Sequence, residues 1–424
     1  MLAHPVVQRS WWASLAILAA VRVGIPLADW ATSVPGLPRF HYRGLRGDAN
    51  GFYDATREFI AAWGRVPRVG LALLALAVVA GAVALVRAWR RRPAERPWLL
   101  AIGALAFGLV VCVDVAEQHP SGAAVFGWPL VWALPMLPYR AVGGHLDHDV
   151  AYGFGLVLSL AAVAGAVVAT AYAGLHATGR RSLGLLAAAF FTAWPFLSGA
   201  IAGHRAWAND QWNVEVGLHM YTEPVSTALV AGGLALVLAP RLTPMRMSVA
   251  GVLLSLASCV KLSNALLAAL ALAIVVWRCG ARRALPYVVG ALSFAPVALV
   301  YWPLSYPKLF GNPHSWPRDP FDPAHVVTAW THSSVFTPHA LAILVPLAAI
   351  GAFGVRRPYA LALVVGWLLI NPIFYSFYAN TPKHPRFLYA SLPALFVLWA
   401  AGLGVLAALV PQLRTRTTPR TLTP

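Results

Sequence analysis

The chain contains 424 residues, of which 59% are hydrophobic and only 11% are charged. A soluble protein of ordinary composition carries about a quarter charged residues, so this sequence falls outside that class. Three cysteines are too few for a disulfide scaffold, and the long unbroken apolar runs exclude disorder, collagen and a β-barrel. The composition predicts an all-α, polytopic transmembrane helix bundle, with residues 1–424 forming a single domain.

The net charge of +18 raises the question of a nucleic-acid partner. The arginines are scattered between apolar runs and do not form a basic soluble module, so we expect no nucleic-acid binding. The expected surroundings are a lipid bilayer, specifically the plasma membrane.

Apolar windows of about 18 to 20 residues recur along the whole chain and predict about 12 membrane spans. The spans expected to be single helices are 11–29, 69–86, 98–115, 150–174, 183–202, 218–239, 284–304, 340–355, 359–377 and 387–410. The stretch 248–277 is interrupted by Lys261, Ser263 and Asn264, so we expect two short helices that meet at Lys261. The Pro-interrupted stretch 123–138 is predicted to be re-entrant or interfacial.

Short arginine-rich connectors indicate the orientation in the membrane. They are 87–97, 177–181, 241–246, 278–283 and 356–358, and the tail 411–424 falls on the same side. The positive-inside rule makes this side, and both termini, cytoplasmic. Glu95 is then the only one of 14 acidic residues on that face, and the longer outer loops carry most histidines. We expect the functional surface outside, although retention of basic residues inside would by itself concentrate acids there.

The first outer loop, 30–68, contains a predicted interfacial helix. Its apolar positions Phe52, Phe59 and Ile60 recur at helical spacing, which is typical of a helix lying in the membrane interface. Asp48 precedes this pattern and is expected at the helix start, where backbone N–H groups favour a carboxylate. The alternative is that Asp48 is only an N-cap.

Four segments together resemble GT-C-type membrane glycosyltransferases, which depend on polyprenyl-phosphate-linked sugars. The first carries Asp48, Tyr53, Ala55, Gly64 and Pro67; the others are LHMYTEPVSTALVAGGLALVL (218–238), SLASCVKLSNALLAALALAIVVWR (255–278) and KHPRFLYASLPALFVLWAAG (383–402). The order and position of these segments are more specific than any single match. Ala49 and Asn50 follow Asp48, so the paired acidic motif of some family members is missing.

The resemblance implies transfer of a sugar from a polyprenyl-phosphate donor to an envelope glycan, glycolipid or protein acceptor outside the membrane. It implies that Asp48 is the essential acidic residue of the first outer loop. Such a reaction needs a base for the acceptor hydroxyl, and direct displacement with one carboxylate inverts the anomeric centre. No cofactor is firmly expected, although a divalent cation is possible.

The departing phosphate needs cations, and few basic residues are expected outside. The candidates are Lys383, His384, Arg386, Lys261 and Arg46. For the group that includes Lys383 and Arg386, the alternative is anchoring at the membrane interface. For Lys261, the alternative is snorkelling of its ammonium group towards water.

Sugar or acceptor binding is predicted for aromatic and polar residues of the outer loops. The candidates are Tyr53, His204, Asp210, Trp212 and Glu223. An aromatic belt at the membrane interface would explain some of the tryptophans equally well. Glu223 is expected inside a helix just before Pro224, where it should pair with a cation or face a cavity.

The second outer loop ends with a dense group of histidines and acids. Asp147 and Asp149 are weak candidates for a divalent metal site, and a solvated turn that caps the next helix is the commoner outcome. Two other classes of function stay open. A secondary transporter or lipid-linked glycan flippase would place charges on broken helices, and a ligase or acyltransferase would share the outer site.

Overall fold

The computed structural model describes residues 5–32, 48–65, 68–118, 127–202, 222–297, 323–332, 338–377 and 385–417. Every regular element in these ranges is a helix and none is a strand, which confirms the all-α prediction for this part of the chain. Four of the described helical segments are long and apolar enough to cross a membrane. They are Arg9–Ala28, His148–Thr178, Pro358–Ser376 and Arg386–Leu409.

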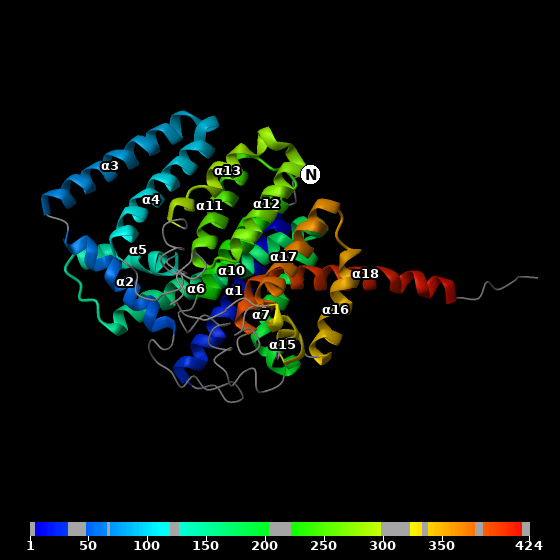
Figure 1. Ribbon diagram of the computed structural model, residues 1–424. Coiled ribbons are helices and arrows are strands. Elements are labelled where there is room, and N and C mark those ends of the chain that lie inside the picture. The colour runs from blue at the N-terminus through cyan, green and yellow to red at the C-terminus, as the bar shows by residue number, and fades with distance from the viewer. Residues whose placement is uncertain are drawn as a thin grey trace, which may run out of the picture.

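The described elements form a helical bundle (Figure 1). In chain order they are α1 (Pro5–Thr32), α2 (Asp48–Arg65), α3 (Arg68–Arg91), η1 (Pro93–Glu95), α4 (Arg96–Gln118), α5 (Gly127–Ala141), α6 (His148–Thr178), α7 (Arg181–Ala202), α10 (Thr222–Leu238), α11 (Pro244–Val260), α12 (Asn264–Cys279), η2 (Ala281–Ala284), α13 (Leu285–Ala291), α15 (Ala324–His332), α16 (Pro338–Ala352), α17 (Pro358–Ser376), η4 (Pro385–Ser391) and α18 (Leu392–Thr417). Most lie within a few residues of a predicted span.

The larger apolar core lies between α6, α7, α10, α11 and α18. Small residues let these helices approach closely: a Cβ built at Gly174 of α6 would lie 3.0 Å from the Cα of Gly184 in α7. Trp367 of α17 is fully buried, and its indole N–H donates to the carbonyl of Ala390 at 2.7 Å. Helix packing through small side chains is typical of membrane bundles.

A second apolar core joins α2 to α5, α6 and α11. α2 begins at Asp48, as the sequence predicts, and its apolar residues Phe52, Tyr53, Phe59 and Ile60 are buried in the protein. The stretch predicted to be re-entrant forms the buried helix α5, whose Trp128 and Trp132 are fully inaccessible. The apolar face of α2 therefore packs on protein side chains.

The predicted break at Lys261 is confirmed. α11 ends at Val260, Lys261 is extended (φ −147°, ψ 124°), and α12 begins at Asn264. The span expected at 284–304 is not continuous, because α13 ends at Ala291 and a turn follows at 292–294. Pro296 has no N–H to donate to the carbonyl of Leu292, four residues earlier, and its ring would clash with that carbonyl in a continuous helix, so the sequence carries the signal for this interruption.

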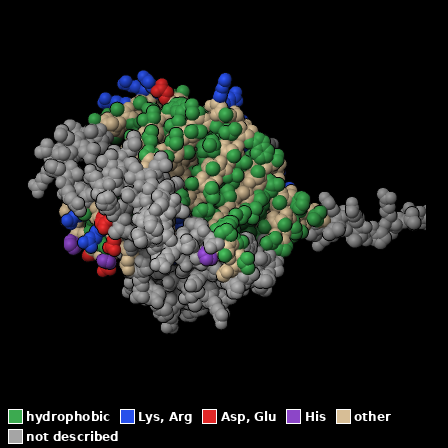
Figure 2. Space-filling view, viewed as in Figure 1, with side chains coloured by type: hydrophobic (Ala, Val, Ile, Leu, Met, Phe, Trp, Pro, Cys, Tyr) green, Lys and Arg blue, Asp and Glu red, His purple; other side chains and the backbone are tan. Residues whose placement is uncertain are grey.

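The described surface has an apolar face between two polar edges (Figure 2). Lysine and arginine side chains gather at the edge near the ends of α3, α4, α11 and α13, and acidic and histidine side chains gather at the opposite edge near α2 and α5 (Figures 1 and 2). Exposed apolar residues on the helices include Val79, Ile102 and Trp277. An exposed apolar surface of this kind is typical of a membrane protein.

Candidate functional site

Three ionisable side chains predicted from the sequence as site residues meet inside the bundle. The Nζ of Lys261 lies 2.8 Å from Oε1 of Glu223, and the Nε of Arg386 lies 3.8 Å from the same oxygen. Their side chains are only 4% (Glu223), 10% (Lys261) and 14% (Arg386) exposed. We refer to Glu223, Lys261 and Arg386 as the buried charge cluster.

The carboxylate of this cluster is held by the first turn of α10. Glu223 is the second residue of the helix, where the helix dipole favours a negative charge. The hydroxyl of Thr222 donates to Oε2 of Glu223 at 3.3 Å, so both carboxylate oxygens have partners. These two contacts hold the Glu223 carboxylate with Oε1 towards Lys261.

The cation of Lys261 lies at the break between α11 and α12, beside two aromatic rings. Its Nζ is 5.1 Å from the centre of the Phe387 ring and 5.7 Å from that of Tyr375. The two rings stack at 4.9 Å with an interplanar angle of 13°. Ser263 donates to the Tyr375 hydroxyl at 3.1 Å, which fixes the ring position. Aromatic faces stabilise a desolvated cation without neutralising its charge.

Asn264 ties the broken helix pair together. Its Nδ2 donates to the hydroxyl of Ser226 on α10 and to the carbonyl of Ala257 on α11, each at 2.8 Å. The Ala257 carbonyl also accepts the backbone N–H of Lys261 at 2.8 Å, so the Asn264 side chain adds a second bond across the break and joins α12 to α10 and α11. The Oδ1 of Asn264 accepts no hydrogen bond from the groups that the structure describes.

Arg386 belongs to η4, and this short helix is anchored on two sides. The hydroxyl of Ser391 donates to the Trp367 carbonyl at 3.2 Å. On the other side, Nη2 of Arg22 donates to the Tyr389 hydroxyl at 2.8 Å. Arg22 is fully buried in α1. These contacts make η4 a rigid support for Arg386.

The buried charge cluster gathers charges of both signs inside the bundle. Lys261 and Arg386 bring two positive charges, and Glu223 brings one negative charge. Burial of charged groups costs several kcal/mol per ion unless partners and hydrogen bonds compensate. Two neighbouring cations can together form charge-assisted hydrogen bonds to an anionic oxygen, and the arrangement therefore suits a phosphodiester or a carboxylate.

Of the other predicted base, phosphate, sugar and acceptor residues, the structure describes the side chain of Tyr53 only. Tyr53 lies in α2, with its ring 4.5 Å from that of His148 and 6.4 Å from that of Trp132, and not in the buried charge cluster. Asp48 begins α2, and its side chain lies outside the described residues, as do Arg46, His204, Asp210, Trp212, Lys383 and His384.

The start of α2 nevertheless shares an apolar core with the buried charge cluster. Ala49, directly after Asp48, is fully buried and belongs to the same contiguous core as Val225 and Val260. Val225 lies two residues after Glu223, and Val260 directly precedes Lys261. Gly127 of α5 packs directly against the backbone of α11 at this point, because a Cβ built at Gly127 would lie 2.5 Å from the Val260 nitrogen.

The two metal candidates, Asp147 and Asp149, lie at the start of α6. The Asp147 carboxylate accepts a hydrogen bond from the Val150 N–H at 2.8 Å and is the N-cap of α6. Asp149 is exposed in the first turn of the same helix. The described residues contain no group of three or more His, Cys, Asp or Glu side chains that could hold a metal ion.

Three residues near the cluster were not among the sequence candidates. Tyr375 and Phe387 lie in apolar stretches and have no signal that separates them from ordinary core aromatics. Arg22 has a signal, since a basic residue within an apolar span is costly and needs a buried partner.

No protein-family model matches the chain, and no similar curated protein or solved structure was found. The fold and the site define the class: an all-helical protein, in its described part, with membrane-length helices and a buried ionic site. The function follows from the chemistry of that site.

Proposed function

We propose that this chain is a GT-C-like integral-membrane glycosyltransferase. It transfers a sugar from a polyprenyl-phosphate-linked donor to an envelope glycan, glycolipid or protein acceptor on the extracytoplasmic face. The observation that supports it is the buried charge cluster, in which two cations share one carboxylate at a helix break. The four membrane-length helices of the described chain and its exposed apolar surface support the membrane location.

The proposed topology has about 12 spans with both termini in the cytoplasm. The basic edge of Figure 2 is then cytoplasmic, and the edge with acids and histidines is external. The buried charge cluster lies at the N-terminal end of α10, whereas the arginine-rich connectors 241–246 and 278–283 lie near its opposite end. This separation supports a site that opens to the external side.

Lys261 and Arg386 bind the donor phosphate in this proposal. A sugar phosphodiester is an anion, and two cations held side by side are suited to bind it. Glu223, predicted from the sequence as a sugar ligand, holds the two cations in position. Lys383 and His384 precede η4 in the sequence and extend the phosphate site, together with Arg46.

Asp48 is the proposed base. Its carboxylate takes the proton of an acceptor hydroxyl, the oxygen attacks the anomeric carbon, and the bond from that carbon to the phosphate oxygen breaks. Polyprenyl phosphate leaves with the bonding electron pair, and Lys261 and Arg386 stabilise the growing negative charge. Tyr53, His204, Asp210 and Trp212 are the proposed sugar and acceptor ligands.

A secondary transporter or flippase is the second candidate. The observation that favours it is the same helix break, because transporters place charged groups on discontinuous helices within the bundle. The two functions differ in their product: an enzyme breaks the glycosidic bond to phosphate, and a transporter moves an intact substrate.

The deciding experiment incubates the purified full chain in lipid nanodiscs with a panel of polyprenyl-phosphate sugars. We expect transfer or slow hydrolysis of one sugar class, detected as free polyprenyl phosphate. Asp48→Asn should lower turnover by roughly 10²- to 10⁴-fold, the usual contribution of a general base. Asp54→Asn is the matched control, since Asp54 is an exposed carboxylate on the same helix.

Equal turnover in Asp48→Asn and the wild type would remove Asp48 as the base. The transporter function would be favoured over the enzyme if no donor is cleaved and intact substrate accumulates in proteoliposomes.

A further inference from the structure

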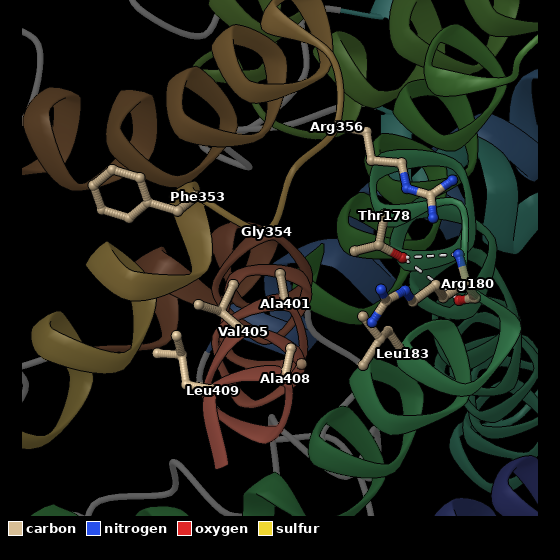
Figure 3. Close-up of a pocket in the computed structure, with 11 residues that line it drawn as sticks. Thr178, Arg180, Leu183, Phe353, Gly354, Arg356, Ala401, Val405, Ala408 and Leu409 are labelled. Atoms are coloured by element: carbon tan, nitrogen blue, oxygen red, sulfur yellow. Dashed lines mark hydrogen bonds between the residues drawn. The ribbon is translucent and has the colours of Figure 1, made fainter. Parts of the chain in front are cut away.

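A second site lies away from the buried charge cluster, where the α6–α7 turn, the α16–α17 connection and α18 meet (Figure 3). The cavity has a volume of about 310 Å³. Its lining on α18 begins at Ala401, ten residues after η4 ends at Ser391. At 1.5 Å per residue this is about 15 Å along the helix, so the two sites are separate.

One side of the cavity is cationic and rigidly built. The Thr178 hydroxyl donates to the Gly174 carbonyl at 2.7 Å and accepts from the Arg180 backbone N–H at 3.2 Å. Gly179 has a positive φ of 72°, and a Cβ there would lie 2.7 Å from Nη1 of Arg356. The guanidinium group of Arg356 therefore depends on the absence of a side chain at Gly179.

The connection that carries Arg356 is fixed to the α6–α7 turn. The backbone N–H of Arg356 donates to the Ala177 carbonyl at 3.2 Å. Figure 3 shows the side chains of Arg180 and Arg356 on the same side of the cavity. Neither guanidinium group has an ion-pair or hydrogen-bond partner among the described residues, and no carboxylate lines the cavity.

The opposite side of the cavity is apolar. Phe353, Val405 and Leu409 lie across from the arginines in Figure 3. Phe353 is 86% exposed and Leu409 is 45% exposed, so the apolar wall continues onto the open surface of the bundle. The cavity thus joins a dicationic pocket to an exposed apolar face.

We propose that this cavity binds an anionic phospholipid. The phosphate lies between the guanidinium groups of Arg180 and Arg356, which form charge-assisted hydrogen bonds to it. The acyl chains lie along the face of α18 that carries Val405 and Leu409. Free phosphate would use only the cationic half of the site, whereas a phospholipid uses both halves. The inference requires membrane insertion but does not depend on sugar transfer.

The test measures lipid retention by native mass spectrometry of the full chain in detergent with phosphatidylglycerol or phosphatidylcholine. A basic residue near an anionic lipid surface changes affinity about fivefold, so we expect Arg180→Gln/Arg356→Gln to weaken phosphatidylglycerol retention roughly 25-fold. The matched control is Arg282→Gln/Arg283→Gln, which removes two exposed arginines from η2, outside the cavity. We expect the control to retain the lipid.

A second variant tests the apolar half. Ala408→Trp fills the groove on α18 and should reduce phosphatidylglycerol retention without weakening competition by inorganic phosphate. The proposal is overturned if phosphatidylcholine is retained equally well, or if both double variants lose phosphatidylglycerol to the same extent. It is also overturned if Ala408→Trp leaves retention unchanged, because the site would then bind only free phosphate.

Discussion

The two ends of α10 use positive charge in different ways. At the first turn, Lys261 and Arg386 face the buried carboxylate of Glu223. At the last turn, Nη2 of Arg278 donates to the carbonyls of Ala239 and Pro240 at 2.8 and 3.2 Å, and Nη1 donates to the Val237 carbonyl. The Arg278 guanidinium also lies 4.3 Å from the centre of the Tyr359 ring.

The cation at the C-terminal end binds the Val237 carbonyl of the last helical turn and two carbonyls of the chain that follows it. The last carbonyls of a helix have no intrahelical donor, and a basic side chain supplies one. The N-terminal end has no such need, because the helix dipole already favours the carboxylate of Glu223. The second cation at that end, Arg386, faces the same carboxylate oxygen as Lys261, and our proposal gives both cations a role in donor binding.

The largest expected effect comes from Glu223→Gln. The substitution removes the carboxylate that Lys261 and Arg386 share, and loss of one partner of a buried ion pair costs about 3 to 5 kcal/mol. Thermal unfolding in detergent, followed by tryptophan fluorescence, measures the change.

The matched control for that substitution is Glu95→Gln. Glu95 pairs with Arg92 at 3.2 Å, but both side chains are exposed, and such pairs contribute little because solvent screens them. If Glu95→Gln lost as much stability as Glu223→Gln, burial of the charges would not explain the loss of stability in Glu223→Gln.

A smaller effect is expected from Arg278→Ala at the other end of α10. Loss of three hydrogen bonds from a half-buried charged group should reduce the free energy of unfolding by about 1 to 2 kcal/mol after allowance for solvent screening. Donor binding should not change. Weaker binding of a polyprenyl-phosphate sugar by Arg278→Ala would contradict the division of roles between the two ends.

Asp147→Ala tests a third use of charge, the N-cap of α6. Loss of the hydrogen bond from Val150 should reduce the free energy of unfolding by about 1 kcal/mol. Stability of the wild type should not respond to a chelator. A chelator effect that disappears in Asp147→Ala would instead restore the metal site that the sequence suggested.

Local features of this fold were predictable from the sequence. Lys261 marked a helix break because a lysine is costly within an apolar run, and Asp48 marked a helix start because of its capping chemistry. The span at 284–304 was predicted as continuous because hydropathy counts apolar residues and ignores that Pro296 cannot donate a helical hydrogen bond to Leu292.

The buried charge cluster was predictable only as separate members. Glu223, Lys261 and Arg386 stand on three segments that are distant in the chain, and only tertiary packing brings them to one carboxylate oxygen. Tyr375 and Phe387 were missed because stacking around a cation depends on the same packing. The number of spans and their orientation stay predictions. Among the described residues, the structure establishes only that four helical segments are long and apolar enough to cross a membrane.

The variant with the smallest expected change in stability best distinguishes a structural role of the buried charge cluster from a role in donor binding. Glu223→Gln/Lys261→Met/Arg386→Met removes every charge of the cluster, and replacement of a complete buried ionic group by apolar residues of similar size is often nearly neutral. The triple variant should therefore unfold close to the wild-type temperature, unlike Glu223→Gln alone. It should nevertheless bind a polyprenyl-phosphate sugar much more weakly, because both buried cations of the proposed phosphate site are gone. A stable triple variant that still binds the donor would mean that the cluster only holds the helices together, and the anion site would have to be sought elsewhere.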